Sequence, residues 1–391
     1  MQLLSTTMNK DFINPPDRTG TGSLKWEKYA GRDILPMWVA DMDLPSPPAV
    51  MEALRARVDH GVFGYTLQHE GVVTAVQDYL KSTHKIEVES AALLWFPGLV
   101  PALNTAARAF AEPGEAIITL TPVYPPFLSA PGNQSRAIQA VPLAESDEGY
   151  TIDFDALESA VTPKTKVFYL CNPHNPVGRV YRRDELEAVL RFCEKFDLII
   201  VADEIHSDLI LDEGLEHISM LSLPGAVERT VGLYAPSKTY NLPGLACSYI
   251  VAPDRTLRRR FQRAAQGMIT EVNCMGYIGC EAAYRHGQDW LDDLIELLRA
   301  NRDSLYAFVR ENCPKIQLRP MQSTYLAWLD VRQLGLKDPV AHFEEHGLGL
   351  SDGRFFGHEG YIRINLGCPE ITMSEGLKRL RRGYDAAVAS A

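Results

Sequence analysis

Hydrophobic and polar residues follow two alternating periods between positions 46 and 285. Segments 47–61 (PPAVMEALRARVDHG) and 98–114 (GLVPALNTAARAFAEPG) have the apolar spacing of amphipathic helices, and each ends at a glycine, as helices often do. Short, nearly continuous apolar runs lie between such helices: AIITL, KVFYL, LIIVAD, TVGLYA and CSYIVAP. Helices that alternate with buried strands predict an α/β fold with a mainly parallel sheet that helices cover on both faces.

The pattern changes after residue 285. WLDDLIELLRANRDSLYAFVREN predicts a long amphipathic helix, and the strand-like runs STYLAWLDV and GYIRINLG lie on either side of a shorter helix, DPVAHFEEHG. We therefore predict three parts: an N-terminal arm (1–45) that joins the small domain, a large domain (46–285) and a smaller α+β domain (286–391).

Composition argues against several classes of protein. The 391 residues are 46% hydrophobic, enough for a large core, and their formal net charge of −11 does not suit a binder of nucleic-acid phosphates. No apolar run approaches the ~20 residues that span a bilayer, and the N-terminus lacks the apolar core of a signal peptide. Seven cysteines without C-x-x-C spacing predict reduced thiols rather than metal ligands. We therefore expect a cytoplasmic protein with no membrane segment and no metal.

Four of the apolar runs lead into polar or aromatic side chains suited to chemistry. These are Tyr124 after AIITL, Asn175 after KVFYL, Asp203 at the end of LIIVAD, and Lys238 after TVGLYA. Taken singly, they have structural interpretations: a core tyrosine, a turn asparagine, a salt-bridged aspartate and a surface lysine. Because ligands of parallel sheets collect beyond the carboxyl ends of the strands, we expect all four side chains in one crevice.

One ligand, pyridoxal phosphate, accounts for these four side chains together. Its aldehyde needs a lysine to form a Schiff base, and its ring nitrogen needs a carboxylate that holds a proton there. Its phenolic oxygen needs a donor, its ring face an aromatic side chain, and its phosphate the backbone amides of a helix start, which PGLVPAL (97–103) supplies. Partial burial beside such groups lowers the pKa of a lysine, so that Lys238 becomes a usable base.

Eight motifs in order extend this interpretation to nearly the whole chain. They are LPMWVADMD (35–43), GYT (64–66), PGLVPALN (97–104), TPVYPPF (121–127), CNPHNPVGR (171–179), DEIHSDL (203–209), APSKTYNLPG (235–244) and IRINLGCP (362–369). With them the sequence resembles the fold-type I pyridoxal-phosphate enzymes of the class I/II aminotransferase family. Within that family it is most similar to the cystathionine β-lyase (C–S lyase) branch of the MalY/PatB type.

The resemblance implies a role for each residue around the cofactor ring. Lys238 would form the Schiff base and remove the Cα proton of the substrate, and Asp203 would pair with the ring nitrogen. Asn175 would bond the phenolic oxygen. His206 would face the same oxygen, where aminotransferases commonly have a tyrosine, unless it is only a structural histidine. Tyr124 would stack on the ring.

The resemblance also implies how the phosphate is bound. Backbone amides of Leu99 and Val100 and the hydroxyl of Ser237 would bind it. Tyr65 would reach the phosphate of the neighbouring subunit in a homodimer, unless it only packs in the interface. Ala246 departs from the common pattern, because many aminotransferases have an arginine on the phosphate eight residues after the lysine. The phosphate would then need other partners, such as dipoles and hydroxyls.

The substrate would be held from the C-terminal part of the chain and from the arm. The resemblance implies that Arg363 binds the α-carboxylate through its planar fork. The alternative is a surface charge, against which its side chain faces opposite to Ile362 and Ile364 on a strand. Asn175 and the Ala40 backbone would help to hold that carboxylate. Trp38 either walls the substrate pocket or belongs to the core of the arm.

The resemblance favours β-elimination as the reaction. The WVADMD, NPHNPVGR and DEIH versions of the motifs resemble the lyase branch, which cleaves an L-cysteine S-conjugate such as cystathionine to a thiol, pyruvate and ammonia. The alternative is an aminotransferase of an L-amino acid, which needs a 2-oxo acid acceptor to turn over repeatedly. A further alternative is a lyase with a second, regulatory role as a partner of a transcription factor.

Overall fold

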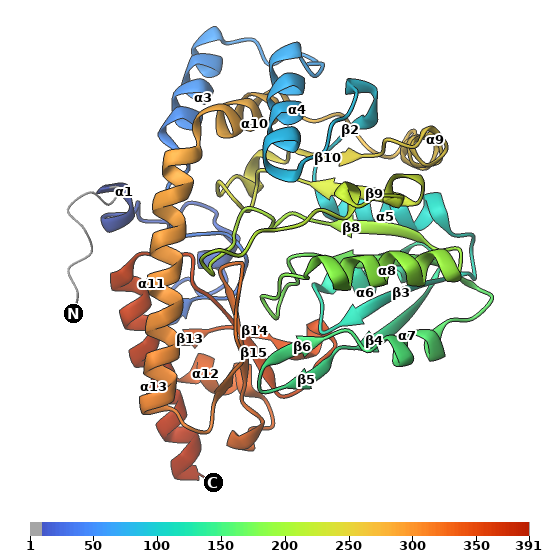
Figure 1. The fold of residues 1–391 in the computed structure, drawn as a ribbon. Coiled ribbons are helices and arrows are strands. Elements are labelled where there is room, and N and C mark those ends of the chain that lie inside the picture. Colours follow the sequence, from blue (N-terminus) through green and yellow to red (C-terminus); the bar gives the residue numbers. More distant parts are fainter. Residues whose placement is uncertain (1–9, 391) are drawn as a thin grey trace.

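A seven-stranded sheet forms the centre of the larger part of the molecule (Figure 1). The structure is a computed structural model that describes residues 10–390. The strands lie in the order β2 (Leu93–Phe96), β10 (Ser248–Val251), β9 (Thr230–Tyr234), β8 (Ile199–Asp203), β7 (Thr165–Cys171), β3 (Ala116–Thr121) and β4 (Ala137–Pro142). All neighbours pair in parallel except β10, which is antiparallel to both β2 and β9. The predicted mainly parallel α/β sheet is confirmed.

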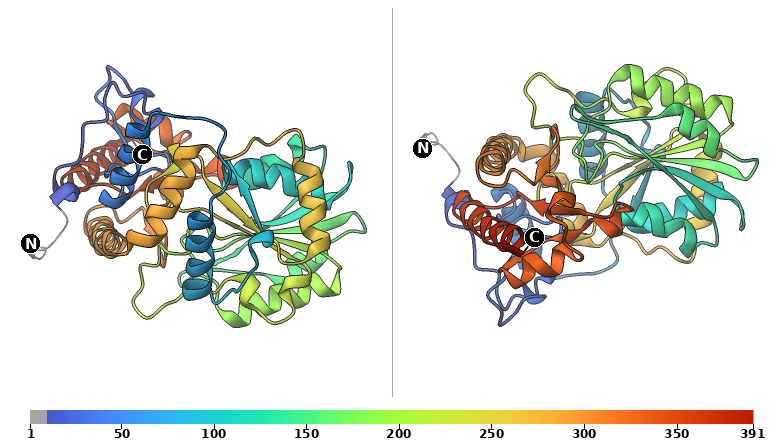
Figure 2. Two further views of the ribbon diagram at one scale, coloured as in Figure 1. Left: turned by 90° about the horizontal axis from the view of Figure 1, so that it is seen from above. Right: turned by 90° about the horizontal axis from the view of Figure 1, so that it is seen from below.

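Helices cover both faces of this sheet, as Figure 2 shows. Alternate residues of β7 point to opposite faces, so that Val167 and Tyr169 join one core cluster while Phe168 and Leu170 join another. The first cluster includes side chains of α5 (Leu99–Phe110), α6 (Pro125–Asn133) and α9 (Arg255–Ala265). The second includes side chains of α7 (Phe154–Ala160) and α8 (Arg183–Lys195). Because both faces are buried, the strands are nearly continuous apolar runs.

Further helices pack at the β2–β10 edge of the sheet. α4 (Glu70–His84) contributes Val72, Val76 and Leu80 to a cluster with Tyr249 and Val251 of β10 and with α10 (Cys274–His286). α3 (Pro48–His60) packs against α10 and ends at Gly61, whose φ of +77° suits a glycine. Residues 61–69 connect α3 to α4 without regular structure.

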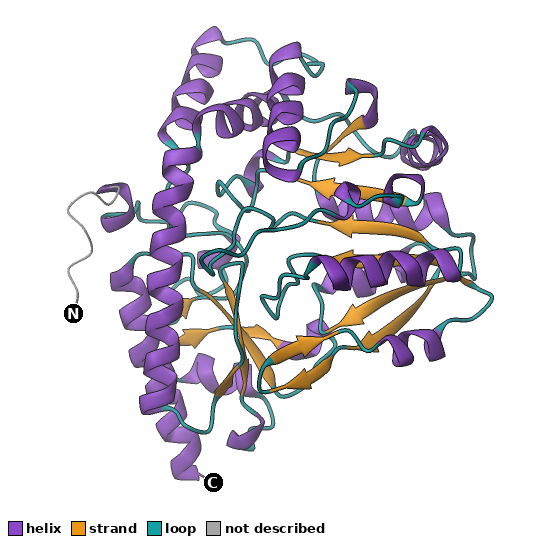
Figure 3. Cartoon of the chain, in the orientation of Figure 1, coloured by secondary structure: helices purple, strands orange, loops and turns teal. Residues whose placement is uncertain are grey.

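The C-terminal part of the chain builds a four-stranded antiparallel sheet with long helices beside it (Figures 1 and 3). The strand order is β11 (Gln317–Leu318), β12 (Leu326–Asp330), β15 (Tyr361–Asn365) and β14 (Ser351–Asp352). α11 (Gln288–Asn312), α12 (Pro339–Glu345) and α13 (Glu370–Ser390) pack on this sheet and share one core with it. Ile362 and Ile364 enter that core, which leaves Arg363 on the opposite face.

The arm packs on this C-terminal part. It contains α1 (Lys10–Ile13), α2 (Leu24–Glu27) and β1 (Leu35–Pro36), and β1 pairs in parallel with β13 (Leu348–Gly349). The first nine residues of the predicted arm lie outside the described residues. The division into an arm and two domains stays a prediction.

Shorter elements complete the chain. They are the hairpin β5 (Ala144–Ser146) and β6 (Gly149–Thr151) and the 3₁₀ helices η1 (Ser90–Ala92), η2 (Met220–Ser222), η3 (Ala226–Glu228), η4 (Pro243–Leu245), η5 (Arg332–Leu334) and η6 (Gly353–Phe356). Within residues 10–390, none of the helices has the length and apolar character needed to cross a membrane.

Candidate active site

Four strand ends bring the predicted side chains to one edge of the large sheet. β3, β7, β8 and β9 are parallel neighbours, so their carboxyl ends share that edge. Asp203 is the last residue of β8, and Lys238 follows the end of β9 by four residues. Tyr124 and Asn175 follow β3 and β7 at similar distances along the chain, and the backbone N–H of Tyr124 donates to the Asn175 carbonyl (3.0 Å).

These side chains line a cavity of about 290 Å³. The predicted residues on its wall are Ala40, Leu99, Val100, Tyr124, Asn175, Asp203, His206, Ser237 and Lys238. The cavity is therefore formed by loops of the large sheet together with one residue of the arm. The structure brings most of the predicted site together.

Lys238 is half-buried on the cavity wall. Its Nζ donates a hydrogen bond to the Ala40 carbonyl (2.6 Å). Burial, together with the positive charge of Arg363, lowers the pKa of Lys238 to about 8 in spite of the weaker opposing effects of Asp41 and Asp203. Near neutral pH roughly a tenth of Lys238 is therefore a neutral amine, far more than for an ordinary lysine, and this is the form that attacks a carbonyl or accepts a proton.

Asp203 is a carboxylate without a full set of partners. Its side chain is 4% exposed, and its Oδ1 accepts one hydrogen bond from the backbone N–H of Ile205 (3.1 Å). Burial raises the pKa of Asp203 to about 7, with a smaller contribution from the charge of Glu204, in spite of the opposing hydrogen bond from Ile205 and the charge of Lys238. A cationic donor in the cavity would reverse this shift, because an ionised buried carboxylate needs such a partner.

A hydrogen bond joins Arg363 to Asn175, which lines the cavity. Arg363 Nη1 donates to Asn175 Oδ1 (3.1 Å), and Nη2 donates to the Trp38 carbonyl (3.0 Å) and to Ser351 Oγ (3.3 Å). The Nε atom of Arg363 is buried and has no hydrogen-bond partner among residues 10–390. Burial lowers the pKa of Arg363 to about 10, which leaves it charged at neutral pH. This cation lacks an anionic partner in the described chain.

His206 and Tyr124 complete the wall. Burial, with smaller contributions from the charges of Lys238 and Arg363, lowers the pKa of His206 to about 3, so the ring is neutral. Its Nδ1 is buried with no hydrogen-bond partner within the described residues. Burial also raises the pKa of Tyr124, so its hydroxyl stays protonated. Both side chains therefore offer uncharged polar groups to a ligand.

The start of α5 forms one end of the cavity. Gly98 precedes the helix with φ +147°, and Leu99 and Val100 are its first residues, so their N–H groups have no partner within the helix. Ser237 and Ser248 line the same cavity. Ala246 also lines it, in a left-handed conformation with φ +50°. Backbone amides and hydroxyls are thus the groups available here to an anion.

Tyr65 and Trp38, like Arg363, are not among the described wall residues of the cavity. Tyr65 is fully exposed in the connection between α3 and α4. The Trp38 indole donates to the Lys25 carbonyl within the arm (3.1 Å), while the Trp38 carbonyl accepts from Arg363. The predicted roles of both side chains stay predictions.

Sequence reasoning missed several residues that hold the site together. Tyr325 Oη donates to the Ala40 carbonyl (3.1 Å), and Ser351 Oγ donates to the Trp38 carbonyl (2.7 Å). Asn365 Nδ2 donates to the Val39 and Asp41 carbonyls, at 2.7 Å each. Asn365 lies two positions after Arg363 on β15. Because side chains alternate along a strand, the sequence could have placed Asn365 on the same face of the sheet as Arg363. The other two carried no comparable signal.

Glu204 points away from the cavity into a separate buried network. Its carboxylate accepts hydrogen bonds from the backbone N–H of Met220 (2.7 Å), from Tyr234 Oη (2.8 Å) and from the His217 ring (3.1 Å). Ligand atoms of Glu204, His217 and His84 lie within 4.8 Å of one another. These hydrogen bonds satisfy the Glu204 carboxylate, so Asp203 and Glu204 have different environments although they are adjacent.

Comparison with known proteins decides the family. The family model described as aminotransferase class I and II matches residues 32–380. The chain belongs to this family. The predicted family and the fold type it implies are confirmed.

Similar members of the aminotransferase family include curated and solved proteins. Cystathionine β-lyase PatB of Bacillus subtilis is 38% identical over 385 residues, which cover 95% of this chain and 99% of PatB. The crystal structure of OvoB matches with a TM-score of 0.93 at 40% identity and covers 95% of this chain and 98% of that one. The crystal structure of cystalysin from Treponema denticola, which contains a pyridoxal 5′-phosphate cofactor, matches with a TM-score of 0.92 at 34% identity, covering 96% and 99%.

Proposed function

We propose that this protein is a pyridoxal-phosphate-dependent C–S lyase that acts by β-elimination on L-cysteine S-conjugates such as cystathionine. The observation that carries the proposal is the convergence of Lys238, Asp203 and Asn175 on one cavity, with Arg363 bonded to Asn175 beside it. The similarity to PatB supports the lyase activity over other reactions of the family.

The donors around the cavity fit pyridoxal phosphate. The aldehyde would meet Lys238, the ring nitrogen Asp203, and the phenolic oxygen Asn175, whose Oδ1 already accepts from Arg363 and whose Nδ2 is the remaining donor. The buried Asp203 carboxylate and the unpartnered His206 Nδ1 are polar groups that such a ring would satisfy. When bound, the cofactor supplies an electron sink for the charge that develops at the substrate Cα.

The side chains themselves position the substrate and move one proton. Arg363 binds the α-carboxylate, and its unpartnered Nε provides a donor for that purpose. Lys238 Nζ accepts the proton from Cα, which its lowered pKa permits near neutral pH. Asp203 stays ionised opposite a protonated ring nitrogen and so holds the proton there. Asp203 and Arg363 are buried, and Lys238 is half-buried beside them, so all three side chains are at least partly shielded from water.

A single incubation tests the proposal. The purified holoenzyme is mixed with L-cystathionine and with no 2-oxo acid, and pyruvate, ammonia and free thiol are measured over many turnovers. The proposal expects all three products in equal amounts. Turnover that stops after one equivalent and resumes when a 2-oxo acid is added would identify an aminotransferase instead.

A further inference from the structure

Residues 38–44 connect the arm to the two charged side chains of the site. The Ala40 carbonyl accepts from Lys238 Nζ (2.6 Å) and from Tyr325 Oη (3.1 Å). The Trp38 carbonyl accepts from Arg363 Nη2 (3.0 Å). The position of this segment therefore helps to set where both cations point.

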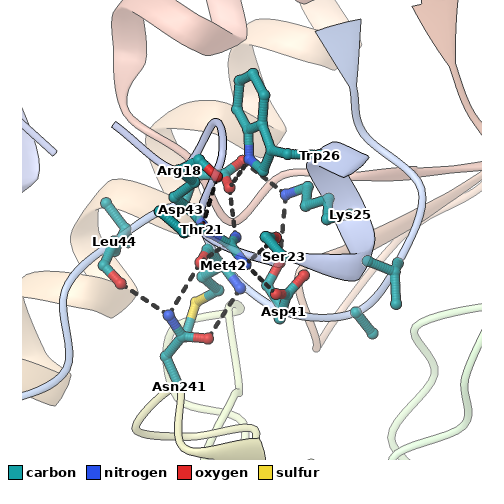
Figure 4. Close-up of polar contacts among 12 residues, drawn as sticks. Arg18, Thr21, Ser23, Lys25, Trp26, Asp41, Met42, Asp43, Leu44 and Asn241 are labelled. Carbon is teal, nitrogen blue, oxygen red and sulfur yellow. Dashed lines mark hydrogen bonds and ion pairs between the residues drawn. The ribbon is translucent and has the colours of Figure 1, made fainter. Parts of the chain in front are cut away.

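Ion pairs among four charged side chains hold this segment to the rest of the arm, and Figure 4 shows these side chains together. Asp41 and Asp43 belong to the segment, and Arg18 and Lys25 come from the preceding part of the arm. Arg18 Nη2 donates to Asp41 Oδ2 (2.5 Å), and its Nη1 donates to Asp43 Oδ1 (2.6 Å). Lys25 Nζ donates to Asp43 Oδ2 (2.7 Å), although Lys25 is only 1% exposed. We call Arg18, Lys25, Asp41 and Asp43 the arm clamp. Two cations balance two anions, so burial leaves no net charge uncompensated.

The side chain of Asn241 also holds this segment. Asn241 lies three residues after Lys238, and its Oδ1 accepts from the backbone N–H of Met42 (2.9 Å). Its Nδ2 donates to the carbonyls of Met42 (3.0 Å) and Leu44 (2.7 Å). Residues 38–44 are thus bonded both to Asn241, near Lys238, and to Arg18 and Lys25 of the arm.

We propose that the arm clamp is a positioning device for the reaction: it fixes residues 38–44 so that the Trp38 and Ala40 carbonyls aim Arg363 and Lys238. The kinetic part of this inference rests on the proposed lyase function. In the clamped segment the two carbonyl dipoles are fixed acceptors for the buried Arg363 and the half-buried Lys238. When the clamp is broken, the backbone regains freedom and the acceptors shift with it. A misplacement of about 1 Å is enough to lower a rate by about 100-fold.

Arg18→Ala is the variant that tests the clamp, because it removes the ion pairs that Arg18 makes with both aspartates and leaves only Lys25 paired with Asp43. Asp33→Asn is the matched control: it breaks the arm's ion pair with Arg379 (2.8 Å), which lies outside residues 38–44. We expect Arg18→Ala to raise the KM for cystathionine about 10-fold and to lower kcat, while the control stays within about twofold. Guanidinium added to the buffer should restore part of the loss, because the Arg18 side chain is 21% exposed.

Amide hydrogen exchange tests the same clamp without any turnover. The backbone N–H of Met42 is bonded to Asn241 Oδ1, and that of Asp43 to the Gly367 carbonyl (2.8 Å). We expect these amides of the holoenzyme to exchange at least about 10-fold faster in Arg18→Ala and unchanged in the Asp33→Asn control. Asp43→Asn keeps the side-chain volume and serves as the second variant should Arg18→Ala not fold.

The outcomes separate the clamp from the proposed function. Unchanged exchange and unchanged KM in the clamp variants would overturn the clamp. Equal changes in Arg18→Ala and Asp33→Asn would also overturn it, because they would show a general loosening of the arm. If the unmodified enzyme does not cleave cystathionine but the exchange result holds, the proposed function fails and the positioning of residues 38–44 by the clamp stands.

Discussion

Arg363 is a buried cation whose Nε lacks a partner within the described chain. A lysine at this position would keep the charge but lose the planar fork that binds a carboxylate through two donors. We predict that Arg363→Lys raises the KM for cystathionine by about 10- to 100-fold, with a much smaller change in kcat, because the lost interaction acts mainly in binding.

Steady-state kinetics over a wide range of substrate concentration measure this effect. Arg354→Lys on η6 is a suitable control, because Arg354 pairs with Asp338 and Asp352 on the surface. An unchanged KM in Arg363→Lys would contradict the carboxylate role.

His206 makes the stability of the apoprotein depend on pH. Burial lowers its pKa to about 3, whereas an unfolded histidine titrates near 6.5. Below pH 6.5 this histidine binds a proton in the unfolded chain but not in the native state. The free energy of unfolding therefore decreases as the pH falls below 6.5. We predict that, when the pH is lowered from 6.5 to 5, the free energy of unfolding decreases by about 2 kcal/mol less in His206→Gln than in the unmodified apoprotein.

Urea unfolding of both apoproteins at the two pH values measures this difference. His286→Gln, at an exposed histidine of α10, should show the same loss as the unmodified protein. Parallel losses for His206→Gln and the unmodified protein would mean that His206 accepts a proton in the native state.

At the scale of elements, the turn from β2 into α5 decides where the helix amides point. Gly98 has φ +147°, so a side chain there strains the backbone that presents Leu99 and Val100. We predict that Gly98→Ala weakens the binding of pyridoxal phosphate to the apoprotein about 10-fold, because the amides no longer converge on its phosphate.

A titration of apoprotein followed by absorbance gives the dissociation constant. Gly132→Ala on α6 is the control, because an added Cβ there meets nothing within 4 Å. Equal dissociation constants for the two variants would mean that this turn does not hold the cofactor phosphate.

The strands that carry the site were predictable because they are short apolar runs with a polar residue at or after the end. β8 is such a run, and Asp203 ends it. The direction of a strand was harder to predict from the sequence. β10 is as apolar as its neighbours yet antiparallel to them, because a strand that is buried on both faces has the same composition whether it is parallel or antiparallel. β4 was missed because it lies at the edge of the sheet and is mostly exposed or half-buried.

The contacts behind the cavity could not be predicted, because they join segments that are far apart in the sequence. Lys238 meets the Ala40 carbonyl 198 positions away, and Ser351 meets the Trp38 carbonyl 313 positions away. Such pairs depend on how the arm lies against β14 and β15, and no local pattern encodes that. The Lys238 motif itself was readable because its residues are contiguous.

At the scale of the molecule, the connection between α3 and α4 displays apolar side chains. Val62, Phe63, Tyr65 and Leu67 are all exposed. Contiguous exposed apolar groups indicate an interaction surface, which supports the expected homodimer with Tyr65 at the neighbouring site. We predict that co-expressed Lys238→Ala and Tyr65→Ala subunits recover about a quarter of the unmodified activity, because half the dimers contain one intact site of two.

Each variant expressed alone should have little activity and should still run as a dimer of 43.6 kDa chains in light scattering. Failure of the mixture to recover activity, with hybrid dimers shown to form, would mean that Tyr65 does not serve the partner's site.

The account depends most on the covalent attachment of pyridoxal phosphate to Lys238. The direct measurement is to reduce the holoenzyme with borohydride, digest it, and find the modified peptide by mass spectrometry. We predict one modified peptide, with the reduced cofactor on Lys238, and loss of the visible absorption band on reduction. A cofactor adduct on another lysine, or a protein that acquires neither adduct nor visible band when pyridoxal phosphate is added, would contradict the account.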